Sequence, residues 1–261
     1  MKNQYVGDVN DYRKYGLLRI LAGEGELRGV VCWALTESDG RSDGSRTTYL
    51  NCPADWMGYD PELFAFLRHA VVQRRVRSVK IVERGGVLPN FSFFGERVPQ
   101  SGEDRDVYFD RCLEFAKGAD IIFLDPDNGL SVKSTPRGSR GSPKYVYPSE
   151  VLLAYSRGHS ILIYQHFPRC ARGPFVSKLV ASTCQSVGAD RAISFHTPHV
   201  VFLLFPQRRH WSALQSGAVK VAHRWRGQIS VEFHHGGAGV PRGVVQVAPS
   251  EFSDRRARVA A

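Results

Sequence analysis

The 261-residue chain has no apolar run of eighteen residues, the length that a membrane-spanning helix requires. Its first residues are polar, so they lack the apolar stretch of a secretory signal. Only five cysteines occur and none forms a CxxC pair, which argues against a disulfide framework. The nine histidines include no HExxH motif. We therefore expect a cytoplasmic protein with reduced cysteines, no membrane contact and no bound structural metal.

Acidic residues are also in short supply, because 25 Asp and Glu face 35 Lys and Arg, for a net charge of +10. From residue 206 onward, nine basic residues face three acidic ones. A surplus of this kind favours a polyanionic partner, since basic side chains near phosphates release condensed counterions. The same surplus is also typical of a solubilising surface with an Arg-rich end. The sequence leaves both interpretations open, and nucleic acid is the partner that we expect.

Helical periodicity alternates along the chain with short, continuous apolar runs, the pattern of buried strands covered by helices on both faces. Two apolar runs near residue 200 are separated by only four residues, so they should pair as an antiparallel hairpin. Helices are predicted over residues 8–22, 61–72, 104–117, from 148 onward and over 172–187; strands are predicted over 30–35, 78–82, 119–124, 160–164, 192–195 and 200–205.

This alternation predicts an α/β fold of the Rossmann-like three-layer type, with a mostly parallel, doubly wound sheet that ends in an antiparallel hairpin. We expect residues 1–235 to form one domain. Residues 236–261 are predicted to be a basic, flexible tail.

The most informative segment is Asp125-Pro126-Asp127-Asn128-Gly129, directly after the apolar run 119–124. Ligands bind open α/β sheets beyond the carboxyl ends of their strands, which is where these side chains should lie. Two carboxylates and an amide could orient an amine, act as a base or hold Mg²⁺. An ordinary turn closing a strand is the alternative, because Pro-Asp-Asn-Gly is also a strong turn sequence.

Other polar residues follow predicted strands in the same way. Asp39 lies in a loop of turn-forming residues, and Glu83 ends the predicted strand 78–82, where an acidic residue could accept hydrogen bonds from a ribose. His166 and Arg169 follow the strand 160–164 and could contact a base and a phosphate. Lys144 closes a basic loop after Gly129 and is a further candidate for phosphate contact.

The first predicted helix carries Asp11 and Lys14, which share one face because they are three residues apart. They could form a local ion pair worth a few tenths of a kcal/mol. They could also bring charge to the ligand-binding edge of the sheet.

Two segments together resemble a known family. The stretch from Gly7 to Tyr15 is similar to the Gly-Asn-x-x-Asp-x-x-Lys-His start of the bacterial 23S rRNA adenine-N6 methyltransferases, and Leu124-Asp125-Pro126 resembles the beginning of their Asp-Pro-Pro-Tyr motif. The whole chain also resembles an uncharacterised bacterial family with Tyr-Val-Gly-Asp-x-x-Asp and Phe-Leu-Asp-Pro-Asp-Asn-Gly motifs.

The methyltransferase resemblance implies a Rossmann-like fold, S-adenosylmethionine as cofactor and Asp125 as the residue that orients the target amine. Asp11 and Lys14 match its first motif. Asp127 and Asn128 depart from the pattern, which has a proline and an aromatic residue at these positions. The segment 30–44 also lacks the GxGxG-like turn of many cofactor-binding strands.

Three functions follow as hypotheses. The first is an S-adenosylmethionine-dependent methyltransferase acting on nucleic acid. The second is a Mg²⁺-dependent nuclease or phosphoesterase that uses Asp125 and Asp127 as ligands, with Lys133 or Lys144 at the phosphate. The third is a noncatalytic nucleic-acid-binding module on the same fold.

For the first function, the candidate residues fall into three groups. Asp125, Asp127, Asn128 and Lys14 are the catalytic candidates; Asp11, Asp39, Glu83 and Asp125 are the cofactor candidates; Arg169, His166 and Lys144 are the nucleic-acid candidates.

Overall fold

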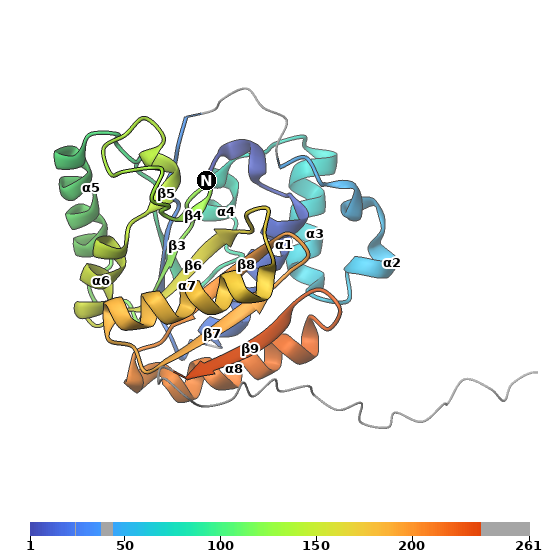
Figure 1. The fold of residues 1–261 in the computed structure, drawn as a ribbon. Coiled ribbons are helices and arrows are strands. Elements are labelled where there is room, and N and C mark those ends of the chain that lie inside the picture. The colour runs from blue at the N-terminus through green and yellow to red at the C-terminus, as the bar shows by residue number, and fades with distance from the viewer. Residues whose placement is uncertain (24, 38–43, 236–261) are drawn as a thin grey trace, which may run out of the picture.

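The computed structural model describes residues 1–23, 25–37 and 44–235, which build a seven-stranded sheet with helices on both faces (Figure 1). The strands lie in the order β2-β1-β3-β6-β8-β7-β9, and a separate two-stranded sheet pairs β4 with β5. The helices are α1 (Val9–Ala22), α2 (Pro53–Trp56), α3 (Pro61–Arg68), α4 (Val79–Arg84), α5 (Gly102–Phe115), α6 (Pro148–Ser156), α7 (Arg172–Val187) and α8 (Trp211–Arg224). The strands are β1 (Gly29–Cys32), β2 (Phe91–Phe94), β3 (Ile121–Leu124), β4 (Gly129–Leu130), β5 (Tyr145–Val146), β6 (Ser160–His166), β7 (Arg191–His196), β8 (Val200–Phe205) and β9 (Ser230–His235).

The sheet is mostly parallel, as the sequence predicts. Strands β2, β1, β3 and β6 pair in parallel. Strand β8 runs antiparallel between β6 and β7, and β9 pairs antiparallel with β7. Five of the seven strands therefore point the same way, and the carboxyl ends of β1, β3 and β6 meet at one edge.

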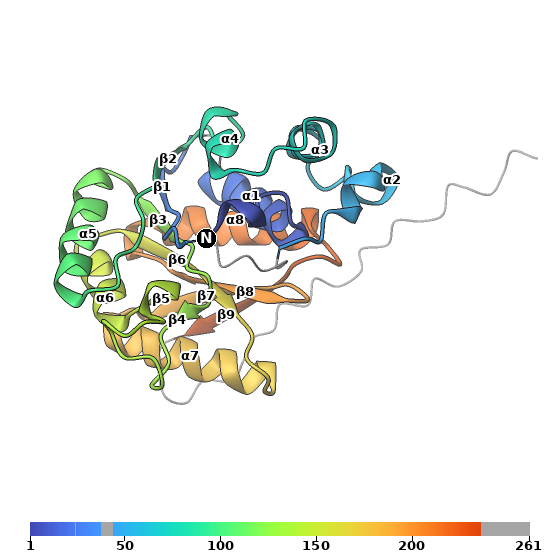
Figure 2. The ribbon, with the colours of Figure 1, turned by 90° about the horizontal axis from the view of Figure 1, so that it is seen from above.

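Two hydrophobic cores lie on opposite faces of the sheet, and Figure 2 shows the three layers. Helices α1, α3, α4 and α8 cover one face, and α5, α6 and α7 cover the other. Alternate residues of each strand enter each core, so that Val31 and Phe123 face α1 while Cys32 and Leu124 face α5. Burial on both faces explains why these strands are continuously apolar. The Rossmann-like three-layer fold predicted from the sequence is confirmed.

The prediction of a strand over residues 78–82 is wrong, because this segment forms helix α4. The Ser78 side chain accepts a hydrogen bond from the backbone N–H of Lys80 and caps the helix. Val79 and Val82 are buried at helical spacing, which overrides the β propensity of the run. The strand beside β1 is instead β2, and the hairpin of β7 and β8 is followed by α8 and β9.

Helix α1 positions the functional residues, and its packing explains its orientation. Asp8 caps it by accepting a hydrogen bond from the backbone N–H of Asn10. Trp225, at the end of α8, is fully buried against Gly16, where an added Cβ would lie 2.0 Å from the indole ring. The Tyr12 ring meets the Trp225 ring edge to face at 4.9 Å between centroids. A glycine at position 16 therefore sets how closely α1 approaches α8.

Replacing Gly16 with Ala should destabilise the protein, because the indole of Trp225 would have to move out of its packed position. We expect a loss of about 1–3 kcal/mol in the free energy of unfolding, the usual range for overpacking, measured by urea denaturation. Gly173→Ala is the matched control, since Gly173 is also helical and a Cβ there meets nothing within 4 Å. That variant should be neutral or slightly stabilised. Equal stability of the two variants would contradict the packing role of Gly16.

Candidate active site

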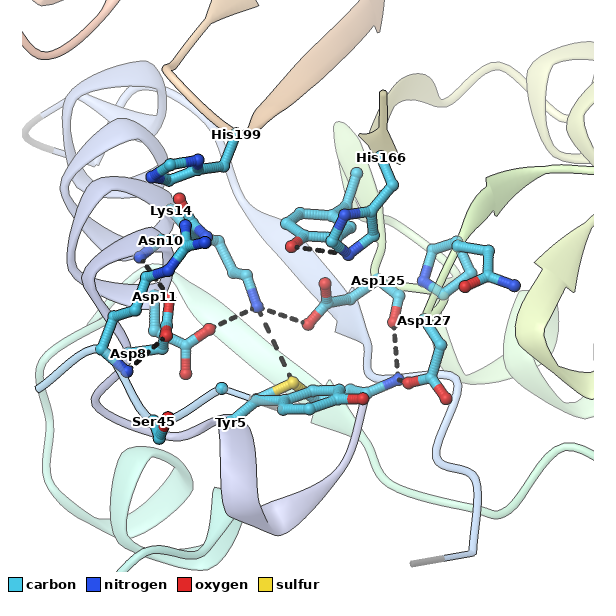
Figure 3. Close-up of a pocket in the computed structure, with 16 residues that line it drawn as sticks. Tyr5, Asp8, Asn10, Asp11, Lys14, Ser45, Asp125, Asp127, His166 and His199 are labelled. Atoms are coloured by element: carbon cyan, nitrogen blue, oxygen red, sulfur yellow. Dashed lines mark hydrogen bonds and ion pairs between the residues drawn. The ribbon is translucent and has the colours of Figure 1, made fainter. Parts of the chain in front are cut away.

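A cavity of about 610 Å³ opens at the sheet edge where β1, β3 and β6 end, beside the first turns of α1 (Figure 3). The strand register explains what meets there. Cys32, Leu124 and Ile163 lie in one row across the sheet, so the next residues, Asp125 and Tyr164, emerge side by side. Both line the cavity, together with Asp11 and Lys14 of α1. Segments more than a hundred residues apart in sequence thus share one site.

The Lys14 ammonium group is the centre of this site. It donates to Asp11 Oδ1 at 2.7 Å and to Asp125 Oδ2 at 2.8 Å, and all three side chains are almost completely buried. The ammonium also lies 5.2 Å from the ring centre of Tyr164, as a cation–π contact. Because Lys14 bonds to a carboxylate on β3 as well as to its own helix, it is more than the local ion pair that its spacing from Asp11 alone would suggest.

Burial and charge act against each other at these groups. Burial would lower the pKa of Lys14, but Asp11 and Asp125 outweigh it and raise that pKa to about 12. Burial raises the pKa of Asp11 to about 6, an effect that Lys14 opposes and Asp125 reinforces. Lys14 is therefore cationic at neutral pH and serves as a fixed positive charge rather than as a nucleophile or base.

Asp127 belongs to a second set of ionic contacts. Its Oδ1 lies 2.9 Å from the amino group of Met1, its Oδ2 accepts from the Thr36 hydroxyl at 2.7 Å, and Lys2 lies 3.8 Å away. Burial disfavours the charged carboxylate, but the Met1 amino group, Thr36 and Lys2 together lower its pKa. The Met1 amino group also donates to the carbonyls of Ala34 and Asp125, at 3.1 and 3.0 Å. Three oxygens thus converge on one ammonium group.

The backbone of Asn128 and Gly129 is held in place by β6 and by the loop that follows. Asn128 donates its N–H to the Lys144 carbonyl and accepts from the N–H of His166. The Gln165 side chain donates to the Asn128 carbonyl at 3.2 Å and accepts from the N–H of Leu130 at 2.8 Å. Gly129 has φ +113, and a Cβ there would lie 2.3 Å from Gln165 Oε1. Glycine is therefore required for this close approach.

Aromatic side chains line the cavity although the segment after Asp125 contains none. Tyr164 and His166 stand two residues apart on β6, and their rings pack edge to face with the Tyr164 hydroxyl 3.2 Å from His166 Nε2. Tyr5 lines the opposite side (Figure 3). The site therefore has aromatic surface on two sides, contributed by other elements than the methyltransferase motif predicts.

Not every predicted site residue lies here. The prediction that Glu83 lies at a strand end and contacts a ribose is wrong, because Glu83 lies in α4. There it accepts a hydrogen bond from Trp33 Nε1 at 3.1 Å and pairs with Lys80 at 3.0 Å. Arg169 is exposed after β6 and does not line the cavity. Lys144 contributes its backbone carbonyl to Asn128, and its side chain is not part of the cavity lining. Asp39 lies outside the described residues.

Sequence reasoning missed other lining residues. Arg46 and His199 come from a loop and from the β7–β8 turn, and Tyr5 precedes the first helix. Gln165, which follows a predicted strand, does not line the cavity but holds the backbone of Asn128 and Leu130. Arg46 offered no usable signal, because it follows a long loop of turn-forming residues.

The arrangement of Asp125 and Asp127 does not suit a shared metal ion. Each carboxylate is engaged by a different cationic group, Lys14 in one case and the Met1 amino group in the other. Among the residues that the structure describes, no group of three His, Cys, Asp or Glu side chains could hold a metal. This donor set weakens the Mg²⁺-dependent nuclease hypothesis.

Removing the Lys14 charge should lower the free energy of unfolding, because two buried carboxylates lose their cationic partner. In Lys14→Met, the pKa of Asp11, which burial already raises to about 6, should rise further, because the cation that opposes the effect of burial is gone. Stability is then retained at low pH and lost as pH rises through the folded pKa of Asp11. We expect a loss of about 3–5 kcal/mol at pH 7.5 and a clearly smaller loss at pH 5, measured by urea denaturation.

Lys80→Met removes an exposed lysine from its pair with Glu83 and is the control, with a change within about 0.5 kcal/mol at both pH values. If Lys14→Met cost the same at pH 5 and pH 7.5, the charge balance described above would be wrong.

Comparison with known proteins gives little beyond this geometry. No family model matches the sequence, and no curated protein matches it. Among solved structures, the chain is similar to a Legionella pneumophila protein, LPL1258, described under the family model DUF519. The sequence identity is 11%, the TM-score is 0.43, and the match covers 89% of this chain and 98% of that chain. Within the described residues, no helix is both long enough and apolar enough to cross a bilayer. A likeness at this level assigns no activity.

Proposed function

We propose that this chain is an S-adenosylmethionine-dependent methyltransferase-like enzyme that acts on an amino group of nucleic acid. One observation carries the proposal. The two segments that resemble methyltransferase motifs are joined directly, because Lys14 Nζ lies 2.8 Å from Asp125 Oδ2. This contact spans 111 residues of sequence, so it follows from the fold rather than from local spacing.

The chemistry of this pair suits amine activation. An amino group that attacks a methyl donor must lose a proton and be held with its lone pair directed at the donor. Asp125 can accept a hydrogen bond from such an amine through the oxygen that Lys14 does not engage, which Figure 3 shows on the side of His166. Lys14 holds this carboxylate in place through its hydrogen bond to Oδ2.

Aromatic side chains in the cavity suit the ring of the nucleobase that carries the amino group. A nucleobase brought into this cavity would find aromatic surface on Tyr164, His166 and Tyr5. In this proposal, these side chains take the place of the aromatic residue that the methyltransferase motif has at position 128. The volume of about 610 Å³ lies in the range of small-molecule sites, so it accommodates an extruded or single-stranded nucleotide rather than a duplex.

The oxygens around Met1 suit the amino-acid part of the cofactor. Ala34 O, Asp125 O and the Asp127 carboxylate already converge on one ammonium group. These residues would hold the methionyl ammonium in place of Met1, and the bound cofactor supplies an activated methyl group. Glu83 is no longer a candidate for the ribose. Asp39 stays a prediction.

The proposal is tested by ligand binding and by methyl transfer. S-adenosylmethionine should give measurable heat in calorimetry and raise the melting temperature. Radiolabelled methyl groups should enter single-stranded RNA or DNA. Asp125→Asn should lower the transfer rate by about 10²–10⁴, the usual contribution of a positioned proton acceptor, with its circular dichroism spectrum unchanged.

Asp110→Asn is the matched control, because Asp110 is an exposed α5 residue that pairs with Arg157 far from the cavity lining, and the variant should keep full activity. An absence of both heat and stabilisation would refute the cofactor assignment. Cofactor-independent binding of nucleic acid without transfer would support the noncatalytic module instead.

A further inference from the structure

The mouth of the cavity has a different charge from its interior. Inside, the carboxylates of Asp11, Asp125 and Asp127 each lie within 2.9 Å of an ammonium group. At the mouth stand Arg46 and His199, both exposed and both lining the cavity. Inside, Asp11 and Asp125 thus share the Lys14 ammonium group and Asp127 pairs with Met1, whereas the exposed Arg46 stands at the entrance.

The position of Arg46 is fixed by its backbone. Its N–H donates to Asp8 Oδ2 at 3.1 Å, and its carbonyl accepts from the N–H of Val9 at 3.0 Å. These bonds tie residue 46 to the first turn of α1. The backbone from which the Arg46 side chain extends is therefore held in place beside the cavity.

Two further arginines act electrostatically on His199, although neither lines the main cavity. Arg13 is buried, bonds through its guanidinium to Asn10 Oδ1 at 3.2 Å and Gln228 Oε1 at 2.6 Å, and stacks over Trp56 at 5.5 Å. Asn10 lines the main cavity, and Figure 3 shows it on the same side as His199.

Arg172, at the start of α7, stacks on Phe167 at 4.6 Å. It lines a shallow neighbouring cavity together with Gln228 and Thr197. Since residue 199 follows Thr197 in the β7–β8 turn, Arg172 and Arg13 flank the turn that carries His199. We call the two exposed arginines, Arg46 and Arg172, the cationic rim.

The rim has no neutralising partner in the part of the chain that the structure describes. Neither of its guanidinium groups forms an ion pair there. The Asp8 carboxylate, which lines the cavity, has its oxygens directed at the backbone N–H groups of Asn10 and Arg46. The surplus charge is felt by His199, whose pKa is lowered by burial and by Arg46, Arg13 and Arg172, with Asp8 opposing.

We propose that the cationic rim binds a phosphodiester group next to the nucleotide that occupies the cavity. Guanidinium groups match phosphate oxygens through paired N–H donors, and stacking on aromatic rings holds their planes in position. The inference deepens the proposed function, because it identifies the part of the substrate outside the cavity. A phosphodiester contact at the rim would fix the position of the nucleic-acid strand on the protein, but it would not distinguish one base sequence from another.

The rim is tested by fluorescence anisotropy of a labelled 12-nucleotide single-stranded RNA, without cofactor, between 50 and 200 mM salt. Arg46→Ala/Arg172→Ala should weaken binding about tenfold or more, as for lost hydrogen bonds to a charged group. The slope of log affinity against log salt should fall by about one to two, one for each lost phosphate contact. A DNA strand of the same sequence tests whether the sugar matters.

Arg208→Ala is the matched control, because Arg208 is exposed and lies beyond the opposite end of β8 from His199, about 20 Å along the strand. It should leave the affinity nearly unchanged.

The outcomes separate the two proposals. Weaker binding in the rim variant with no methyl transfer by any variant would keep the phosphodiester site and refute the proposed function. Methyl transfer with RNA affinity unchanged in the rim variant would refute the rim. No RNA binding by the wild type, or an equal loss in Arg208→Ala, would also refute it.

Discussion

The site depends on one buried ionic contact, that of Lys14 with Asp11 and Asp125. Removing three charged groups from water costs several kcal/mol for each ion, and only close mutual pairing offsets that cost. Every member must therefore be present and correctly placed. Because Asp11 and Lys14 lie on α1 while Asp125 follows β3, the contact couples the first helix to the centre of the sheet. The fold and the chemistry share this requirement.

The packing of α1 makes that placement possible. Gly16 lets the helix approach Trp225, and the Tyr12 hydroxyl donates to the Trp56 carbonyl at 2.9 Å, so the helix is held from two sides. Buried aromatic rings have few ways to rearrange, and a close-packed core transmits displacement instead of absorbing it. A shift of α1 would therefore move Lys14 away from Asp125. The aromatic cluster under α1 acts on the site at a distance, through position alone.

The sequence predicts the sheet edge better than the residues that gather there. The apolar run before Asp125 and the Asp8 cap are local signals, and both are found in the structure. The strand predicted over residues 78–82 is helix α4 instead, because a serine cap and two buried valines at helical spacing outweigh the β-branched composition. Arg46 and His199 could not be found, since their place depends on which loops converge in space. Periodicity identifies the end of a strand, but it carries no information on what faces it.

The division of charge follows from the same geometry. Groups near the sheet edge are buried by α1, so they persist only in close contact with groups of opposite charge. Groups at the mouth keep contact with water, which makes unpaired arginines inexpensive there. A ligand with a polar, uncharged group and a neighbouring anionic group would find a complementary environment both inside the cavity and at its entrance. A nucleotide within a strand has this composition, whereas a free carboxylic acid or a metal ion would meet the wrong charge in one of the two layers.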